Sequence, residues 1–292
     1  MPDIQSELGK VVFVGAGPGN PELLTVRARE VLEANAIAIV DAEVSSGVRD
    51  VVARAVPVPQ ELLDAAEAEY ARICAEAKEA GARRKPSRPA APTAAVFYAP
   101  EGGDVVKQMR EALVEADGLD VIRLVSGNPL NRESIKAEIS AVAAAGLEFQ
   151  VVPGMSLPST VPSFAGLALG ATYTEADITE GADWDSLASA TQPLVLQATA
   201  EDLPLISREL IDRGMSADME AYVTVHGTTR LQRTHETTLG TLGKLDAELP
   251  GDLVVTLGRS FDDRSKYSWW ENRPLYGWRV LVPRTKEQAA AM

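Results

Sequence analysis

The sequence predicts an α/β protein with largely parallel strands, because short apolar runs alternate with helical patterns along most of the chain. Residues 11–14 (VVFV) and 36–40 (AIAIV) are continuous apolar runs, which is typical of strands buried on both faces. Between them, the apolar positions of residues 24–32 recur at helical spacing. A glycine-rich turn joins the first strand to this helix, so the opening of the chain predicts a strand–turn–helix–strand unit.

The same alternation continues to about residue 257. It predicts further helices over residues 60–80, 105–115, 132–145, 157–168 and 201–214. It predicts further strands at residues 94–98, 120–125, 148–152, 194–197, 220–225 and 253–257. We expect two α/β domains, residues 10–128 and 129–260. Residues 81–93 hold three prolines and four basic side chains, which predicts an exposed loop.

The composition excludes several classes of function. The 292 residues carry a formal net charge of −14, which disfavours nucleic acid as a partner. One cysteine and two histidines offer neither a disulfide nor a metal-ligand cluster, and they make a serine- or cysteine-based hydrolase a poor hypothesis. The first residues show no signal-peptide pattern, and no apolar run is long enough for a membrane span. We therefore expect a cytoplasmic protein without a metal.

The turn after the first strand is a candidate ligand-binding loop with the sequence Gly15-Ala16-Gly17-Pro18-Gly19-Asn20. Its place between a strand and a helix, with Asp41 after the next strand, fits a dinucleotide-binding fingerprint. Asn20 stands where that fingerprint has glycine, and Pro18 lacks the N–H that a phosphate cradle would use. A nicotinamide dinucleotide site and a tight turn without a ligand are the alternatives at this point.

A longer stretch favours another cofactor. The string VVFVGAGPGNPELLTVRAREVLEANAIAIVD resembles the opening of tetrapyrrole methylases, and VIRLVSGNPL, GLEFQVVPGMS, PSFAGLAL and HGTTRLQR resemble later segments of that family in the family's order. The resemblance covers about residues 10–260. It implies two α/β domains of the class III methyltransferase type, an active-site cleft between them and a homodimer. It also implies S-adenosyl-L-methionine as methyl donor and S-adenosyl-L-homocysteine as product.

The resemblance assigns roles residue by residue. The cofactor-binding positions that it implies are Pro18, Ser126, Gly127, Asn128, Asn131, Ser156, Leu157, Ala198 and Gly227. A tetrapyrrole substrate would meet Gly17, Gly19, Arg27 and Arg49, because an octacarboxylate needs basic partners. The basic residues Arg83, Arg84, Lys85 and Arg88 form either a lid or a solvated loop.

Asp41 matches the family's proton acceptor. It also follows a predicted parallel strand, at the edge where open α/β sheets place their sites. The alternative is an aspartate that caps a helix or a turn. The reaction implied is methyl transfer from a sulfonium to a ring carbon of a reduced tetrapyrrole, which requires positioning and no covalent enzyme nucleophile.

The last part of the chain resembles a junction between domains. The string KYSWWENRPLYGWRVLVPRTKEQ is similar to the point where actinobacterial-type proteins pass from a uroporphyrinogen-III C-methyltransferase domain into uroporphyrinogen-III synthase. Residues 261–292 are thus expected to be a tail and the first strand of a synthase domain. A terminal edge strand of the same domain is the alternative. The implied pathway is that of siroheme or cobalamin.

The sequence departs from the family at polar positions. Asp41 lies in Val40-Asp41-Ala42-Glu43, where the family has Tyr-Asp-Arg-Leu, and Ser126-Gly127-Asn128 replaces Gly-Gly-Asp. Substrate-facing groups are lost while glycines and prolines remain. A second hypothesis follows: a non-catalytic, methylase-like domain that binds a tetrapyrrole or the cofactor and supports the synthase.

Overall fold

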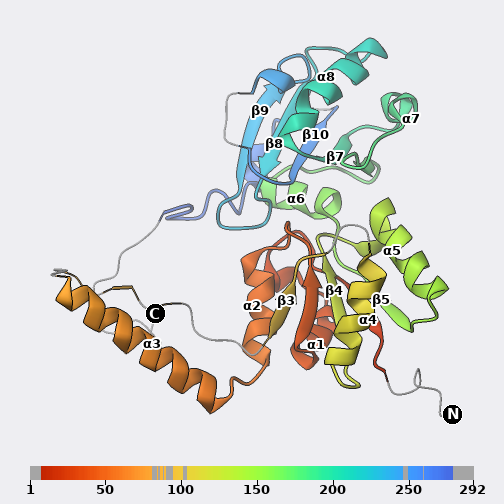
Figure 1. Ribbon diagram of the computed structural model, residues 1–292. Coiled ribbons are helices and arrows are strands. Elements are labelled where there is room, and N and C mark those ends of the chain that lie inside the picture. Colours follow the sequence, from red (N-terminus) through yellow and green to blue (C-terminus); the bar gives the residue numbers. More distant parts are fainter. Residues whose placement is uncertain are drawn as a thin grey trace. The chain divides into compact units, whose positions relative to one another are not determined.

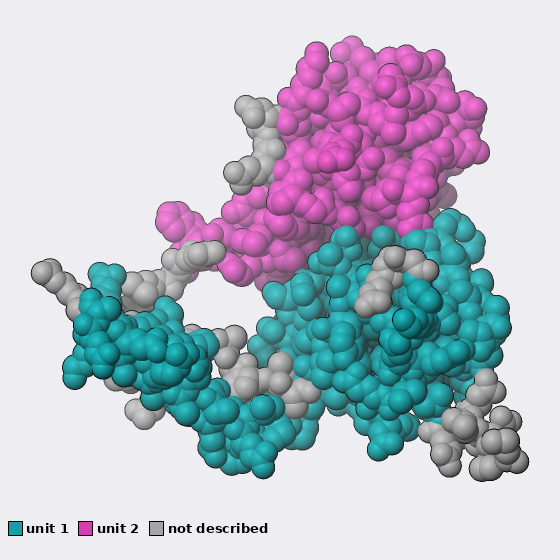
Figure 2. Space-filling model, in the orientation of Figure 1, with its two compact units in different colours: residues 1–157 teal, residues 158–292 magenta. Residues whose placement is uncertain are grey.

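The structure is a computed structural model that describes residues 8–80, 84, 86, 87, 89, 95–100, 104–245, 249–258 and 260–278. The chain forms two compact units, residues 1–157 and 158–292, which Figure 2 colours separately. Each unit contains one sheet with helices packed against it, so the predicted α/β class is confirmed. Among the described helices, none is long and apolar enough to cross a membrane.

The first unit is built on a five-stranded parallel sheet (Figure 1). Its strand order is β3-β2-β4-β1-β5, and each neighbouring pair is parallel. The strands are β1 (Val11–Gly15), β2 (Ile37–Val40), β3 (Val96–Tyr98), β4 (Val121–Val125) and β5 (Phe149–Val152). The carboxyl ends of these parallel strands share one edge of the sheet, so the turns after β1, β2 and β4 meet there.

Helices cover both faces of this sheet, as its continuous apolar strands predicted. Val12 and Val14 belong to the apolar cluster that includes α1 (Val26–Ala34) and α2 (Ser46–Ala55). Val11 and Phe13 belong to the opposite cluster, with α4 (Val105–Glu115) and α5 (Glu133–Ala144). Successive residues of each strand therefore face different helix layers, and this alternation decides the direction of every strand side chain.

Local capping explains where the first helix begins. A short 3₁₀ turn, Pro21–Leu23, precedes the helix expected over residues 24–32. In this turn the side chain of Asn20 accepts a hydrogen bond from the backbone N–H of Glu22. α1 begins only at Val26, because the Thr25 side chain accepts from the N–H of Ala28. α2 was not predicted, although Ser45 caps it in the same way.

The long helix α3 (Gln60–Glu79) confirms the helix expected over residues 60–80. It has no buried residue, and Leu62 and Leu63 are exposed.

The second unit contains a mixed sheet with the order β6-β7-β10-β8-β9. Its strands are β6 (Thr174–Asp177), β7 (Leu194–Ala198), β8 (Glu220–Val225), β9 (Arg233–Thr238) and β10 (Leu253–Leu257). Only β6 and β7 pair in parallel, so the expectation of largely parallel strands is wrong for this unit. The reason is that β9 turns back on β8, and β10 inserts antiparallel between β7 and β8. β6 and β9 were not predicted because their sequences, TEAD and RTHETT, are polar and only partly buried.

One face of this second sheet packs against α7 (Trp184–Ser189) and α8 (Leu203–Asp212). On the other face, Tyr222 of β8 clusters with Ala165 at the end of α6 (Leu157–Ala165) and with Phe261. The remaining described helices are α9 (Arg264–Tyr267) and the short 3₁₀ turns Pro129–Asn131, Ala200–Asp202 and Leu242–Lys244.

The domain boundary differs from the one expected between residues 128 and 129. β5 pairs with β1, and α5 packs against the first sheet, so both elements belong to the first unit. The units divide after Leu157 instead. A sequence pattern of helix and strand does not reveal which sheet the strand joins.

Close packing at the sheet edge gives a first prediction. A Cβ atom on Gly15 would collide with the backbone nitrogen of Gly154 and lie 2.6 Å from the carbonyl oxygen of Gly127. Gly15→Ala should therefore lower the free energy of unfolding by at least about 2 kcal/mol, because three backbone segments must separate. Chemical denaturation measures this change.

The matched control is Gly47→Ala in α2, where the added methyl group would meet only side-chain atoms, the nearest being Pro21 Cδ at 3.3 Å. This control should change the unfolding free energy by no more than about 1 kcal/mol. Equal stabilities of the two variants would contradict the tight approach at Gly15.

Candidate functional site

The glycine loop after β1 lies beside the segment that follows β4. The backbone N–H of Gly127 donates to the carbonyl oxygen of Gly17 at 3.0 Å, and the N–H of Gly17 donates to the oxygen of Gly127 at 3.2 Å. Both residues have positive φ angles, +66° and +68°, which glycine adopts without strain. Two segments more than a hundred positions apart in the sequence thus form one backbone turn at the carboxyl edge of the first sheet.

A third segment, residues 153–157, closes on the same turn. Gly154 packs against the backbones of Gly15 and Gly127, and a Cβ on Gly127 would lie 3.4 Å from Leu157 Cδ1. The Thr25 hydroxyl also donates to the carbonyl oxygen of Pro153 at 3.5 Å. The segments that the family resemblance matched independently are therefore packed together in the first unit.

The predicted cofactor residues of this unit fall on these three segments. They are Pro18, Ser126, Gly127, Asn128, Asn131, Ser156 and Leu157. Asn128 and Asn131 are joined by a hydrogen bond of 2.8 Å from Nδ2 to Oδ1, across the 3₁₀ turn Pro129–Asn131. Pro18 and Ser126 are buried, whereas Asn131 is exposed. Small residues, amide side chains and backbone turns are the groups that the adenosine part of a cofactor needs at close range.

Open space at Gly17 is consistent with such a ligand. A Cβ on Gly17 would have one neighbour within 4 Å among the described residues, the carbonyl oxygen of Leu23 at 3.7 Å. This glycine is thus required by its φ angle, and the space above it is not filled by the residues described. The residues present fit a flat nucleoside at this edge.

The other two predicted cofactor residues lie in the second unit, where they share an edge of its sheet. Leu253 of β10 pairs with Ala198 at the end of β7 and also with Val225 at the end of β8. Ala198 is fully buried, and Gly227 follows Val225 by two positions. A Cβ on Gly227 would collide with the side chain of Val161, so the chain itself requires glycine there.

The strand alternation places Asp41 in a buried ion-pair network. Asp41 follows Ile39 on the α4–α5 side of the first sheet, and Arg123 is the register partner of Ile39. Arg123 Nη1 donates to Asp41 Oδ1 at 2.6 Å, while its Nε and Nη2 donate to the two carboxylate oxygens of Glu138 at 2.8 and 2.9 Å. Arg132 Nη1 adds a 3.4 Å contact to Asp41 Oδ2.

Burial sets the electrostatics of this network, because the Arg123 side chain is only 2% exposed. Desolvation acts to lower the pKa of the Arg123 guanidinium, but the hydrogen bonds to Glu138 and the charges of Asp41 and Glu138 outweigh it and raise the pKa above its usual value. A permanently charged arginine therefore lies in the core beneath Asp41. Its hydrogen bond to Oδ1 orients the Asp41 carboxylate.

A hollow of about 580 Å³ opens next to Asp41 within the first unit. Its charged lining consists of Asp41, Glu43, Arg49, Arg123, Arg132 and Glu138. Phe97, Tyr98 and Ile135 add an apolar wall. A concave surface with a few convergent charges and an apolar wall has the composition of a small-molecule site.

The predicted substrate residues are distributed unequally around this hollow. Arg49 lines it, from α2. Arg27 lies on the exposed surface of α1 and pairs with Glu30 at 3.2 Å. Gly17 is part of the backbone turn described above, and the carbonyl oxygen of Gly19 accepts a hydrogen bond from the Ser45 hydroxyl at 2.6 Å.

Of the basic residues expected at 83–88, Arg84 is exposed, and Arg83, Lys85 and Arg88 lie outside the described residues.

Sequence reasoning missed Arg123, Arg132 and Glu138. The signal for Arg123 was present: a charged residue in the middle of a strand buried on both faces must find a partner of opposite charge. Its partners could not be read from the sequence, because Asp41 is 82 positions away.

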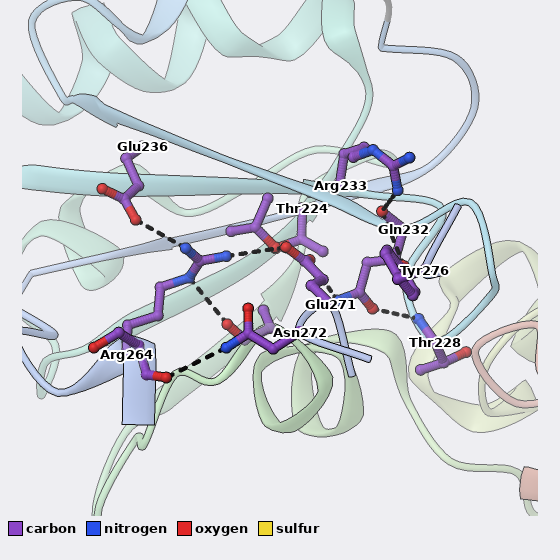
Figure 3. Close-up of polar contacts among 12 residues, drawn as sticks. Thr224, Thr228, Gln232, Arg233, Glu236, Arg264, Glu271, Asn272 and Tyr276 are labelled. Atoms are coloured by element: carbon purple, nitrogen blue, oxygen red, sulfur yellow. Dashed lines mark hydrogen bonds and ion pairs between the residues drawn. The ribbon is translucent and has the colours of Figure 1, made fainter. Parts of the chain in front are cut away.

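The structure describes part of the tail expected at residues 261–292. Residues 260–278 belong to the second unit, and they include α9 and the tryptophans Trp269, Trp270 and Trp278, of which the first two donate hydrogen bonds to backbone carbonyl groups of this unit. Figure 3 shows their polar contacts with β9 and with the loop that precedes it. The strand expected at 279–284 lies outside the described residues.

Comparison with known proteins agrees with this arrangement. The model of the tetrapyrrole (corrin/porphyrin) methylases matches residues 10–243. The siroheme synthase of Stutzerimonas stutzeri is 29% identical over 92% of this chain, and that of Pseudomonas fluorescens is 30% identical over 90%. The chain spans about half the length of these two relatives, 54% and 52% respectively.

Solved structures show the same fold at low identity. The uroporphyrin-III C-methyltransferase of Thermus thermophilus, in complex with S-adenosylhomocysteine, is 20% identical with a TM-score of 0.61, and the match covers 86% of this chain and 97% of that one. A cobalt precorrin-4 methyltransferase of cobalamin biosynthesis is 18% identical with a TM-score of 0.61, over 85% and 94% of the two chains.

The buried network gives a second prediction. Glu138→Gln should lower the free energy of unfolding by roughly 3 kcal/mol, because it removes one of the charges that compensate the buried Arg123. Denaturant unfolding of the variant measures the loss. Glu133→Gln on the same helix is the matched control, since Glu133 pairs with Lys136 at the surface and its loss should cost less than about 1 kcal/mol. If the two variants unfold at the same midpoint, the pairing of Arg123 is not a stabilising one.

Proposed function

Because the chain belongs to the tetrapyrrole (corrin/porphyrin) methylase family, we propose that it is an S-adenosyl-L-methionine-dependent C-methyltransferase acting on uroporphyrinogen III. The observation that carries the proposal is the backbone pairing of Gly17 with Gly127. It joins the glycine loop to the Ser126-Gly127-Asn128 segment, the two parts of the first unit that the family resemblance assigns to the cofactor. The relatives named siroheme synthase and uroporphyrin-III C-methyltransferase support the choice of reaction and substrate.

The proposed cofactor contacts are those that the family resemblance assigns within each unit. In the first unit these are Pro18, Ser126, Gly127, Asn128, Asn131, Ser156 and Leu157, and in the second they are Ala198 and Gly227. When bound, the cofactor supplies a methyl group on a sulfonium, and its product is S-adenosyl-L-homocysteine. The chain contributes close backbone contact and exclusion of water, both of which favour attack by a carbon nucleophile.

The hollow beside Asp41 suits the polycarboxylate substrate. Arg49 and Arg132 line it and can bind carboxylate groups, while Arg123 beneath is committed to Asp41 and Glu138. In this proposal Asp41 accepts the proton that leaves the methylated macrocycle. A substrate carboxylate that binds Arg132 would draw this arginine away from Asp41. Substrate binding would thus free one oxygen of the Asp41 carboxylate to accept the proton.

The ion pairs of Asp41 also favour a second candidate function. Asp41 contacts two guanidinium groups and so serves as a counter-ion of Arg123 and Arg132, a structural role that needs no turnover. Glu43 in the same hollow adds a negative charge that would repel a carboxylate substrate. These features support a methylase-like domain that binds the tetrapyrrole or the cofactor without turnover.

Homodimerisation and covalent linkage to uroporphyrinogen-III synthase are further parts of the proposal. They rest on the family resemblance and on the sequence RVLVPR at residues 279–284. The product would enter siroheme or cobalamin synthesis, which the names of the similar proteins support.

Cofactor binding is tested first. We expect wild-type protein to bind S-adenosylhomocysteine in calorimetry, and Asn131→Ala to bind about tenfold more weakly through loss of a polar contact. Asn131 is exposed, so its truncation leaves the core intact. Gly127→Val is a poorer probe, because a β-branched residue at φ +68° would strain the backbone whether or not a ligand binds there.

Gln60→Ala, an exposed amide on α3, is the control and should retain wild-type affinity. Equal binding by Asn131→Ala and wild type would show that Asn131 is no cofactor contact. No binding by the wild type would reject the methyltransferase proposal.

Asp41→Asn tests the reaction. We expect an affinity for S-adenosylhomocysteine close to that of the wild type and a rate of methyl transfer to uroporphyrinogen III lower by about a hundredfold or more, as for loss of a general base. Transfer of a radiolabelled methyl group measures the rate. Asp50→Asn, at an exposed Asp50–Arg54 pair on α2, serves as the control.

Unchanged transfer in Asp41→Asn would remove Asp41 from its role. Binding of both ligands without any transfer in the wild type would favour the non-catalytic candidate over the enzyme.

A further inference from the structure

The loop between β8 and β9 has a conformation that its own residues disfavour. His226 and Thr228 have φ angles of +50° and +64°, in the left-handed region that side chains with a Cβ atom rarely occupy. Thr228 is β-branched, so its strain is the greater. Gly227 lies between them and is one of the predicted cofactor contacts. Such a loop persists only where its surroundings determine its shape.

Gln232 supplies one such constraint. It is fully buried, and its Oε1 accepts a hydrogen bond of 2.7 Å from the backbone N–H of Thr228. This bond ties the strained residue to the start of β9. The position of the Gln232 amide therefore decides the position of the loop.

Glu271 fixes that amide. Its Oε1 accepts from Gln232 Nε2 at 2.8 Å and from Thr234 Oγ1 at 2.7 Å, and its Oε2 accepts from Arg264 Nη2 at 3.2 Å (Figure 3). The side chain of Glu271 is only 15% exposed. A mostly buried carboxylate with three donors is well oriented, and it determines which end of the Gln232 amide faces Thr228.

Two aromatic residues near Glu271 hold the other side of the loop. Trp270 Nε1 donates to the carbonyl oxygen of Thr229 at 3.0 Å, and the Tyr276 hydroxyl lies 3.3 Å from the same oxygen and 3.0 Å from that of Gln232. Desolvation and the charge of Glu271 raise the pKa of Tyr276 to about 12, so its hydroxyl remains a donor at any physiological pH. The loop is thus bonded to Trp270 and Tyr276 at two backbone carbonyl groups.

These residues are themselves anchored to the second unit. Trp269 and Trp270 pack against Phe164 with ring centroids 5.1 and 5.0 Å apart, and Arg273 stacks on Trp270 at 4.0 Å. Arg264 Nε donates to the carbonyl oxygen of Ala165 at 3.0 Å. The family match ends at residue 243, so this anchored segment lies beyond the part of the chain that the family defines.

We propose that residues 260–278 form a strap that holds loop 226–229 in its cofactor-binding conformation, with Glu271 as the positioning residue that acts through Gln232. The inference rests on the proposed function, because it takes Gly227 as a cofactor contact. The strap fixes the loop before the ligand arrives and so removes the ordering that binding would otherwise require.

The test compares Glu271→Ala with Glu271→Gln in the full chain. Glutamine keeps one oxygen for Gln232 and Thr234 but has an NH2 group in place of the oxygen that accepts from Arg264, whereas alanine removes every acceptor. We expect Glu271→Ala to weaken S-adenosylhomocysteine binding about tenfold or more, and Glu271→Gln to restore most of that affinity. Hydrogen exchange followed by mass spectrometry should show faster exchange at residues 226–232 in Glu271→Ala, while β7, β8 and β10 keep their protection.

Glu236→Ala is the matched control. Glu236 also pairs with Arg264, at 2.9 Å, but it is 61% exposed, and none of the dashed contacts in Figure 3 joins it to the loop. It should leave both affinity and loop exchange at wild-type values. A general loss of protection in Glu271→Ala, extending to the three central strands, would show a structural role only and overturn the proposal.

The two measurements separate this inference from the proposed function. If wild-type protein binds the cofactor product and Glu271→Ala binds it equally well or better, the strap proposal fails and the methyltransferase proposal stands. If wild-type protein does not bind it, the methyltransferase proposal fails. The cofactor role of the strap then fails as well, and loop exchange still shows whether Glu271 holds residues 226–229.

Discussion

The backbone pairing of Gly17 with Gly127 is the constraint on which the candidate site depends. Parallel strands end at a common edge, and β1 and β4 are neighbours, so the turns that follow them must share a small space. Two glycines with positive φ angles allow two hydrogen bonds to form across that space. The turn at Gly154 then packs against both segments. Residues assigned to one cofactor from three separate parts of the sequence are brought together by this contact.

A second constraint is electrostatic. The sheet buries Arg123, and burial of a guanidinium is tolerated only with full compensation. Asp41 provides it from the turn after β2 and Glu138 from α5, and Arg132 adds a further cation at the edge of the hollow. The residue expected to accept a proton is therefore also a structural counter-ion. Arg132 is the more exposed of the two arginines that contact Asp41, so it is the one that a bound polycarboxylate can displace.

The second unit also holds a loop with positive φ angles, but its residues at those angles are not glycines. Its loop at residues 226–229 includes two left-handed residues other than glycine, and hydrogen bonds from outside the loop hold it in place. In the first unit, glycines accept the unusual backbone angles without strain. In the second, the buried Gln232, four positions after Thr228, and Glu271, 39 positions after Gln232, fix the angles through hydrogen bonds. The predicted cofactor contacts thus depend on glycine backbone angles in the first unit and on buried side-chain hydrogen bonds in the second.

From the sequence alone, we could predict the fold class, all five strands of the first sheet and the segments that the family shares. These depend on local patterns: apolar runs for buried strands, helical spacing for α1, α4 and α5, and glycines where the chain must turn. It also singled out Asp41, because a polar residue after a buried strand lies at the functional edge of a parallel sheet. Four features could be known only from the folded protein: the partners of Asp41, the unit to which β5 belongs, the antiparallel insertion of β10 and the packing of residues 260–278 within the second unit. These features are contacts between residues far apart in the chain. Their energies come from burial and charge compensation in three dimensions, which no local pattern of residues records.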